Sequence, residues 1–228
     1  MTVIKKNDFV EIRFTGYSQG KIFDSNVEAD LKQINPNAKP QKTALVVGHG
    51  MLVGGFDKAL EGKEVGKEYT IELKAKDAFG ERKKDLLKTI PLKVFTEKKI
   101  QPYPGLVLTI DDMLAKIITV SGARVVTDFN NPLSGKDVSY KFTVIKKIDD
   151  EKEKVQTLFE VTLGFAPEFE IKDNIVIKGP KEFEALVKAL GSRFKELLGK
   201  DLKFELKEEK KNEVKVEDKK EEKTENKK

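Results

Sequence analysis

Several residue types are missing or scarce in this 228-residue chain, and each absence narrows what the protein can do. No cysteine is present, which excludes disulfides, thiol nucleophiles and cysteine-based zinc sites. The one histidine, His49, cannot form a histidine-rich metal site. We therefore expect a protein that works without a metal or another cofactor.

Long hydrophobic runs are missing as well. No stretch reaches the ~18 apolar residues that a membrane-spanning helix needs, and residues 1–8 lack the apolar centre of a secretion signal. These features predict a cytoplasmic protein with no membrane partner. The formal charge is only +5, without a basic stripe, so nucleic acid is not the expected partner. Charged residues nevertheless make up 36% of the chain, a Lys/Glu-rich composition that fits a thermophile.

A glycine-rich stretch, residues 46–67, is the centre of the chain. Phe56, Ala59 and Leu60 fall on one face of a short helix, and Gly62 is placed to end it. The glycines could suggest a phosphate-binding loop. We reject that alternative because no Lys-Ser or Lys-Thr pair follows them and the spacing is not GxGxxG.

Alternating apolar residues predict strands on both sides of this stretch. The segments concerned are residues 9–14, 43–47, 69–73 and 138–144. About forty residues separate residue 95 from the last of these strands, too many for a structureless loop in a compact domain. Residues 105–110, 115–120 and 123–129 are strand-like, with a turn at Ser121-Gly122. We infer a small inserted β domain.

The chain resembles the FKBP family of peptidyl-prolyl cis-trans isomerases. The similarity rests on Phe14-Thr15-Gly16 followed by Phe23-Asp24-Ser25, on Val53-Gly54-Gly55-Phe56 followed by Ala59-Leu60-Glu61-Gly62, and on Asp77-Ala78-Phe79-Gly80. The segment Val126 to Lys136, VTDFNNPLSGK, is similar to the SlyD-like subfamily, whose members carry an insert-in-flap domain. Asn131 and Ser134 replace the usual histidine and alanine of that subfamily.

This resemblance implies a pocket for a prolyl ring. Its expected walls and contacts are Phe14, Phe23, Asp24, Leu52, Val53, Phe56, Phe79 and Phe142. Rotation about the Xaa-Pro bond has a barrier of ~18–20 kcal/mol, and a dry aromatic pocket can favour the twisted amide without a nucleophile or metal. Phe14, Phe56 and Phe79 replace a tyrosine, a tryptophan and a tyrosine that are common in the family. We therefore expect an active isomerase that binds the family's macrolide inhibitors weakly.

The resemblance also implies a chaperone activity, because the insert of SlyD-like proteins holds unfolded chains. The expected client-binding residues are Ile100, Tyr103, Leu106, Met113, Ile117 and Ile118. The partners would be unfolded or nascent polypeptides that contain Xaa-Pro. SlyD ends in a nickel-binding, histidine-rich tail that has no counterpart here, so we carry over no metal.

Residues after 150 predict a further small α+β domain. Val155, Thr157, Phe159, Val161 and Leu163 alternate as in a strand, after a charged linker at residues 149–154, and residues 169–177 read as a second strand. Pro180 precedes an apolar helical stripe that ends at Gly199, and residues 202–206 form a last strand. So small a unit could dimerise. Residues 208–228, mostly Lys, Glu and Asn, should be disordered.

The predicted class is therefore α+β, in four parts. These are an FKBP-like domain at 1–91 plus 130–150, an inserted chaperone domain at 92–129, a ββαβ domain at 151–207, and the tail at 208–228. Two alternatives stay open: a non-catalytic FKBP-fold holdase chaperone, and a ribosome or nucleic-acid adaptor. The SlyD-like features resemble those of archaeal long-type members.

Overall fold

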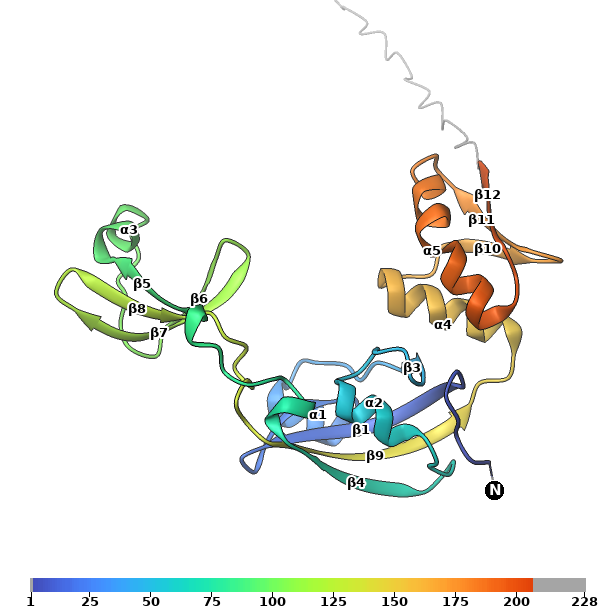
Figure 1. The fold of residues 1–228 in the computed structure, drawn as a ribbon, viewed down its shortest axis with the longest axis horizontal. Coiled ribbons are helices and arrows are strands. Elements are labelled where there is room, and N and C mark those ends of the chain that lie inside the picture. The colour runs from blue at the N-terminus through green and yellow to red at the C-terminus, as the bar shows by residue number, and fades with distance from the viewer. Residues whose placement is uncertain (1, 207–228) are drawn as a thin grey trace, which may run out of the picture. The chain divides into compact units, whose positions relative to one another are not determined.

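The computed structural model describes residues 2–206 and divides into two compact units, one spanning Met1–Ala166 and the other beginning at Pro167. The first unit holds two separate antiparallel sheets and the second holds a mixed sheet (Figure 1). The predicted α+β class is therefore confirmed. Within residues 2–206, no helix is long and apolar enough to cross a membrane. The predicted disordered tail, 208–228, lies outside the described residues.

The main sheet of the first unit has five antiparallel strands in the order β2-β1-β9-β4, with β3 pairing to β1. Their bounds are β1 Phe9–Ser18, β2 Lys21–Ser25, β3 Thr43–Val46, β4 Glu68–Leu73 and β9 Val138–Lys147. The shorter elements between them are α1 Glu28–Ile34, α2 Gly54–Leu60, and the 3₁₀ turns η1 Ala75–Asp77 and η2 Lys84–Leu86. The first and last strands of this domain thus lie side by side at its centre (Figure 1).

Strand alternation gives this sheet one apolar face. Tyr140, Phe142 and Val144 on β9 are all buried, as are the residues of β1 that face them across the ladder. Phe56 and Leu60, four residues apart on α2, pack onto the same face and are also buried. The core of the domain therefore lies between α2 and the centre of the sheet.

The inserted segment forms a sheet of its own, which confirms the predicted β insertion. Four strands run antiparallel in the order β5-β8-β7-β6: β5 Leu87–Pro91, β6 Val107–Ile110, β7 Met113–Ser121 and β8 Arg124–Asp128. A short helix, α3 Leu92–Glu97, covers it, and Phe95, Ile117 and Val125 form its core. Because β5 pairs with β8, the sheet already begins at Leu87, before residue 92. The domain boundaries given above stay predictions.

The segment predicted as a strand at 155–163 is a helix, α4 Glu151–Leu163, so that prediction was wrong. Its buried residues Val155, Leu158 and Phe159 follow one another at i, i+3 and i+4, so they lie on one face of a helix. Burial of this face decides the structure, although the same segment also alternates apolar and polar residues. The Asp150 carboxylate accepts a hydrogen bond from the Glu153 amide at 2.8 Å, which caps the first turn. The expected charged linker at 149–154 is thus largely the start of this helix, which packs on β3 within the first unit.

The second unit has the predicted ββαβ order, with the helix and the last strand where they were expected, but its first two strands come from other residues than predicted. Its elements are β10 Glu168–Ile171, β11 Ile175–Gly179, α5 Phe183–Leu198 and β12 Leu202–Leu206. The single strand expected at 169–177 is a hairpin, because Lys172-Asp173-Asn174 turns the chain and the Lys172 amide bonds the Asn174 carbonyl at 3.0 Å. The sheet order is β10-β11-β12, with β12 parallel to β11. The helix ends at Gly199, as predicted.

Candidate functional site

Five aromatic rings from distant segments meet on the apolar face of the main sheet. We call this cluster the aromatic pocket; it consists of Phe14, Phe23, Phe56, Phe79 and Tyr140. The Tyr140 ring stacks on Phe56 with centroids 4.5 Å apart, and lies edge-on to Phe23 at 5.7 Å. Phe14 meets Phe56 at 6.0 Å, and Phe79 meets Phe23 at 5.6 Å. The structure therefore brings together four of the ring-bearing residues expected from the sequence.

Tyr140 is the residue that the sequence analysis missed. Phe142, which was expected in its place, is buried behind Phe56 at 5.0 Å and lies against Tyr69 at 5.7 Å. Both Tyr140 and Phe142 point to the same face of β9 because they are two residues apart. The two rings differ in their contacts, since Tyr140 reaches Phe23, whereas Phe142 faces Phe14 across the β1–β9 ladder and is only 1% exposed. Phe142 thus supports the pocket from within the core.

Asp24 stands beside these rings, on β2. It faces Gly16 across the β1–β2 ladder, and Gly16 in turn faces Tyr140 across the β1–β9 ladder. Partial burial raises the pKa of the Asp24 carboxyl, and a hydrogen bond with the Ser25 backbone opposes this shift. Burial, and secondarily the charge of Asp24, raises the pKa of Tyr140 to about 12. The phenol is therefore a hydrogen-bond donor throughout the neutral and mildly alkaline range.

A cavity of about 290 Å³ opens beside this group, lined by Phe14, Asp24 and Leu52 among others. Its volume is at the lower end of the range for small-ligand pockets, ~300–1,000 Å³. Leu52 and Val53 are half-buried and pack against the core, and Val53 is the residue that precedes the first turn of α2. There is thus open space next to three of the residues expected to contact a substrate.

Hydrogen bonds to the backbone hold Phe14 in place. The Asn26 side chain accepts from the Phe14 amide at 2.8 Å and donates to the Ile12 carbonyl, also at 2.8 Å. The Ser25 hydroxyl donates to the Phe14 carbonyl at 3.1 Å. Because Ser25 and Asn26 directly follow Asp24 in the chain, the segment that carries the carboxylate also fixes the ring beside it.

A buried carboxylate closes the glycine-rich loop before α2. Asp57 accepts hydrogen bonds from the amides of Gly48 at 2.9 Å and Gly50 at 2.7 Å, one with each oxygen. Both glycines have positive φ, 83° and 66°, which other residues adopt only with strain. The amides of this glycine-rich loop, which could suggest a phosphate-binding site, are thus already bonded to the Asp57 carboxylate. It fixes the N-terminal end of α2, and with it Phe56.

Gly16 provides the room in which the rings pack. A Cβ atom there would lie 2.7 Å from the tip of the Phe23 ring and 2.9 Å from the Tyr140 ring. Such distances are shorter than carbon atoms tolerate, so any larger side chain would displace one ring or both. The glycine of the Thr15-Gly16 pair therefore has a packing role in the pocket.

The loop that carries Phe79 is attached to the segment that returns from the insert. The Ser134 hydroxyl donates to the Phe79 carbonyl at 3.2 Å, and the Gly135 amide donates to the Gly80 carbonyl at 2.9 Å. The Asn131 side chain accepts from the Leu133 amide at 2.8 Å and shapes the turn between them. The two departures from the SlyD-like sequence thus make structural contacts at the edge of the pocket.

The residues expected to bind clients on the insert differ in exposure. Tyr103 and Met113 are 58% and 50% exposed, whereas Ile100, Leu106 and Ile118 are half-buried. Ile117 is 0% exposed and belongs to the core of the insert sheet, so it cannot contact a client, and its inclusion was wrong. Ile117 and Thr127 are partners across the β7–β8 ladder, so their side chains lie on the same face of the sheet. Both are buried, which shows that this face is the inner one.

Val107 and Leu114 are the most exposed of the apolar residues on the insert that were not expected from the sequence. Val107 is 50% exposed and Leu114 is 49% exposed. They lie on neighbouring strands, β6 and β7, two register positions apart, and point away from the core of the insert sheet. The strand alternation of β7 could have indicated Leu114, since it lies two residues before the charged Lys116 and therefore on the same face of the strand.

The chemistry available in this pocket is that of apolar walls, one carboxylate and one phenol. Among residues 2–206, no group of three or more histidine, aspartate or glutamate side chains is arranged to hold a metal ion. Neither a thiol nor a histidine stands among the pocket residues described above. Such a site is suited to binding an apolar ring next to an amide and to acting on the conformation of that amide.

Comparisons with known proteins show the family to which this chain belongs. A family model described as FKBP-type peptidyl-prolyl cis-trans isomerase matches residues 2–103, and one described as FKBP26, IF domain, matches residues 88–133. The chain is 32% identical over 147 residues to the short-type peptidyl-prolyl cis-trans isomerase of Methanocaldococcus jannaschii, a match that covers 63% of this chain and 92% of that protein. It therefore belongs to the FKBP-type peptidyl-prolyl cis-trans isomerase family.

SlyD proteins are similar over a shorter region. The Escherichia coli K12 SlyD is 31% identical over 101 residues, covering 43% of this chain and 52% of SlyD. The Vibrio cholerae SlyD is 30% identical over 101 residues, with 43% and 50% covered. The chain thus spans about half the length of these SlyD relatives.

Proposed function

We propose that this FKBP-type isomerase acts on Xaa-Pro bonds in folding polypeptides, and that its insert holds the unfolded chain. The observation that carries the first part is the aromatic pocket with Asp24 beside it. Phe23 and Phe79 are half-buried and form the accessible wall, while Phe56 is buried beneath them. Leu52 and Val53 border the same core and can offer backbone groups to an extended peptide.

The pocket would lower the barrier to rotation about the Xaa-Pro bond by stabilising the twisted amide more than the planar amide. The planar Xaa-Pro bond is stabilised by C–N double-bond character, which is lost in the twisted transition state. Apolar walls exclude the water that solvates the polar planar amide, and so favour the twisted form in relative terms. The Asp24 carboxylate adds a negative potential next to the amide. No covalent step is required.

A protease-coupled assay on short Xaa-Pro peptides tests the catalytic proposal. We expect the wild type to accelerate isomerisation and Asp24→Ala to lower kcat/KM. Glu72→Ala, which removes an exposed carboxylate from β4, should leave kcat/KM unchanged. A wild-type protein that suppresses aggregation but does not accelerate isomerisation would establish the rival function, a non-catalytic holdase.

The chaperone proposal is supported by exposed apolar side chains on the insert. Tyr103, Val107, Met113 and Leu114 are each about half exposed in a segment of only some forty residues. Surfaces of this kind are typical of sites that bind other polypeptides, and a methionine side chain adapts to varied partners.

A deletion that preserves the domain junction tests this second activity. Leu87 and Asp128 face each other across the β5–β8 ladder, so residues 88–127 can be replaced by two glycines that close a hairpin. We expect the shortened protein to isomerise short peptides as before, but to lose aggregation suppression and to act more slowly on an unfolded protein. Unchanged turnover of the unfolded protein would contradict the proposal.

The remaining parts of the proposal concern partners and setting. A homodimer through the second unit is supported by α5, whose apolar residues are mostly only half-buried, with Phe194 alone fully buried. Light scattering of the full chain at several concentrations tests it. A cytoplasmic, archaeal and thermophilic setting is supported by the Lys/Glu-rich composition. The rival role as a ribosome or nucleic-acid adaptor predicts RNA binding that weakens steeply with salt.

A further inference from the structure

A second cavity, of about 340 Å³, lies between the outer face of the insert sheet and the segment that returns to the main sheet. We call it the insert cavity. Its apolar lining comes from the insert strands: Val107 on β6, and Leu114 and Ile118 on β7. Its basic lining comes from Lys116 on β7, Arg82 before the insert and Lys136 after it. It therefore combines an apolar floor with a cationic rim.

The strand register explains this combination. Lys116 stands in one row of the outer face, between Val107 on β6 and Asp128 on β8. Residues two apart on a strand share a face, which also brings Leu114 next to this row. The inward-facing residues of β7, Ala115 and Ile117, are both 0% exposed, and Ile117 belongs to the core of the insert. The outer face therefore carries the insert residues that line the cavity, opposite the segment that returns to the main sheet.

The one carboxylate that lines the insert cavity already has its partners. Asp128 is only 9% exposed at its side chain and pairs with Arg82. Its other oxygen accepts from the Asn130 amide at 3.0 Å and from the Asn130 side chain at 2.7 Å. Asp137, adjacent to Lys136 in sequence, pairs with Lys74 at 2.7 Å. Within residues 2–206, neither Lys116 nor Lys136 takes part in an ion pair, so two ammonium groups of the rim are available.

The net charge of the whole chain is concentrated in the segment that contains the insert. Residues 82–136 contain ten lysines and arginines but five aspartates and glutamates, an excess equal to the formal +5 of the complete sequence. The rest of the chain is balanced. A local excess of this kind attracts anionic ligands and accelerates their encounter.

We propose that the insert cavity selects, among unfolded polypeptides, apolar segments flanked by acidic residues. This inference rests on the proposed chaperone function and specifies its substrate class. An apolar side chain would cover Val107, Leu114 and Ile118, and a neighbouring Asp or Glu would pair with Lys116 or Lys136. A nucleic acid would supply the charge but is not favoured, because no aromatic side chain lines the cavity to stack on a base.

Binding of proline-free peptides to the full-length protein tests this selection, since such peptides have no prolyl ring for the aromatic pocket. Three fluorescent peptides share one apolar centre and carry glutamate, glutamine or lysine flanks. We expect the glutamate peptide to bind about three- to tenfold more tightly than the glutamine peptide, and the lysine peptide most weakly. The difference should shrink when salt rises from about 0.05 to about 0.5 M.

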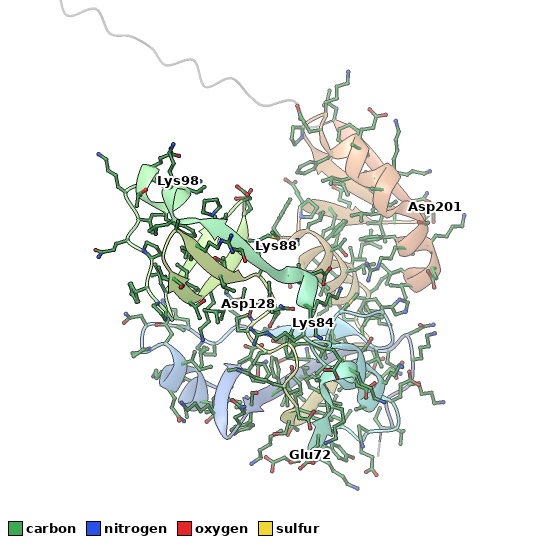
Figure 2. The ribbon with its side chains drawn as sticks, turned by 60° about the vertical axis from the view of Figure 1, so that its left-hand side comes forward. Glu72, Lys84, Lys88, Lys98, Asp128 and Asp201 are labelled. Carbon is green, nitrogen blue, oxygen red and sulfur yellow. The ribbon has the colours of Figure 1, made fainter. Side chains whose placement is uncertain are left out.

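Paired variants separate the cavity from the general charge. Lys116→Gln with Lys136→Gln should remove the preference for the glutamate peptide. The control, Lys88→Gln with Lys98→Gln, removes the same charge from exposed insert residues that do not line the cavity, and Lys98 lies at the end of α3, well away from Asp128 (Figure 2). It should keep most of the preference. Leu114→Ser should weaken all three peptides alike, because it acts on the apolar floor.

The outcomes distinguish this inference from the function on which it rests. Equal affinity for the three peptides, or an equal loss in the control pair, would overturn the acidic preference while leaving chaperone binding in place. If no peptide binds and the wild type does not suppress aggregation, the chaperone function itself fails, and the preference with it. An RNA oligonucleotide that binds the insert cavity more tightly than the glutamate peptide would replace the polypeptide partner by nucleic acid.

Discussion

Tyr140 stacks on Phe56 with ring centroids 4.5 Å apart and planes inclined by 25°, and this pair joins the centre of the main sheet to α2. Tyr140 is buried, with an exposed fraction of only 4%. Its hydroxyl forms no hydrogen bond within residues 2–206. The hydroxyl oxygen nevertheless keeps some solvent-accessible surface. The oxygen is therefore not fully enclosed, and close to the charge of Asp24 it can donate to a substrate carbonyl.

Tyr140→Phe should lower turnover without loosening the fold. The loss of one hydrogen bond in the transition state costs ~0.5–1.5 kcal/mol, which lowers kcat/KM a few-fold to tenfold. The matched control is Tyr69→Phe, whose hydroxyl accepts from the Glu64 amide at 3.0 Å. That change should reduce the free energy of unfolding but leave kcat/KM unaltered. Equal kcat/KM in wild type and Tyr140→Phe would remove the phenol from the mechanism.

Phe79→Tyr should strengthen binding of the family's macrolide inhibitors. Phe79 meets Phe23 edge-on at 5.6 Å and is half-buried, so a para hydroxyl can reach the pocket opening. We expect the wild type to bind such a macrolide weakly and the variant to bind several-fold more tightly by calorimetry. A wild-type complex of nanomolar affinity would contradict this, since it would show that no donor is missing at residue 79.

Asp24 should make stability and turnover respond to pH in opposite directions. Because burial raises the folded-state pKa of Asp24, the folded state binds its proton more tightly than the unfolded state does. Its contribution to stability is therefore present below the unfolded pKa, near 3.8, and is lost as pH rises through the folded pKa. Asp24→Asn should thus stabilise the protein slightly at neutral pH, and not at all at acidic pH.

Turnover should fall with the protonation of the same group. If the carboxylate acts on the amide, kcat/KM of the wild type decreases as pH drops through the raised pKa of Asp24, while the Asp24→Asn variant has a low and flat profile. Thermal unfolding and the protease-coupled assay, both measured across the acidic range, check the two trends. A wild-type profile that matches the variant would show that the carboxylate does not act in catalysis.

Gly16→Ala should disturb the pocket more than the fold. The added Cβ would come within 2.7 Å of the Phe23 ring and 2.9 Å of the Tyr140 ring, both of which line the pocket. We expect kcat/KM to fall at least tenfold and the free energy of unfolding to fall by about 1–3 kcal/mol. The control is Gly54→Ala at the start of α2, where a Cβ meets nothing within 4 Å. Full activity in Gly16→Ala would show that the rings can shift without cost.

Alternation and motif agreed at Phe14, Phe23 and Phe56, and the structure brings these three rings into one cluster, while their role in catalysis stays a prediction. Sequence reasoning failed to choose between Tyr140 and Phe142, because a period of two places both on one face and only the tertiary packing decides which ring enters the pocket. Ile117 was misplaced for a related reason. The β7–β8 register shifts between Ile117 and Thr119, so the inward-facing side could not be followed through the strand.

The error at 155–163 had a signal that could have corrected it. Asp150 and Glu153 match the spacing of a helix cap and its third residue, and Gly164 follows in the left-handed conformation that ends many helices. Helical spacing of Val155, Leu158 and Phe159 was present beside the apparent alternation. The helix therefore could be predicted from its ends, whereas its docking on β3 could not be read from the sequence.

That docking predicts where the chain can be shortened. Val155, Leu158 and Phe159 are each 0% exposed, and α4 belongs to the first unit. Removal of the chain after Ala166 should leave a folded isomerase with an unchanged kcat/KM on short peptides. Removal after Asp150 also strips these three side chains from the core. Each buried side chain contributes ~1.5–3 kcal/mol to the free energy of unfolding. The combined loss should therefore remove most of the stability of a typical domain.

A point substitution provides the matched control for this truncation. Phe159→Ala in the full chain should cost ~3–5 kcal/mol in the free energy of unfolding, because it empties a buried site. Glu153→Gln should cost much less, although Glu153 bonds Lys146 at 2.8 Å and also pairs with Lys42, since these side chains are partly exposed. Equal stability of the chains ending at Asp150 and at Ala166 in urea denaturation would show that α4 packs on the first unit without stabilising it.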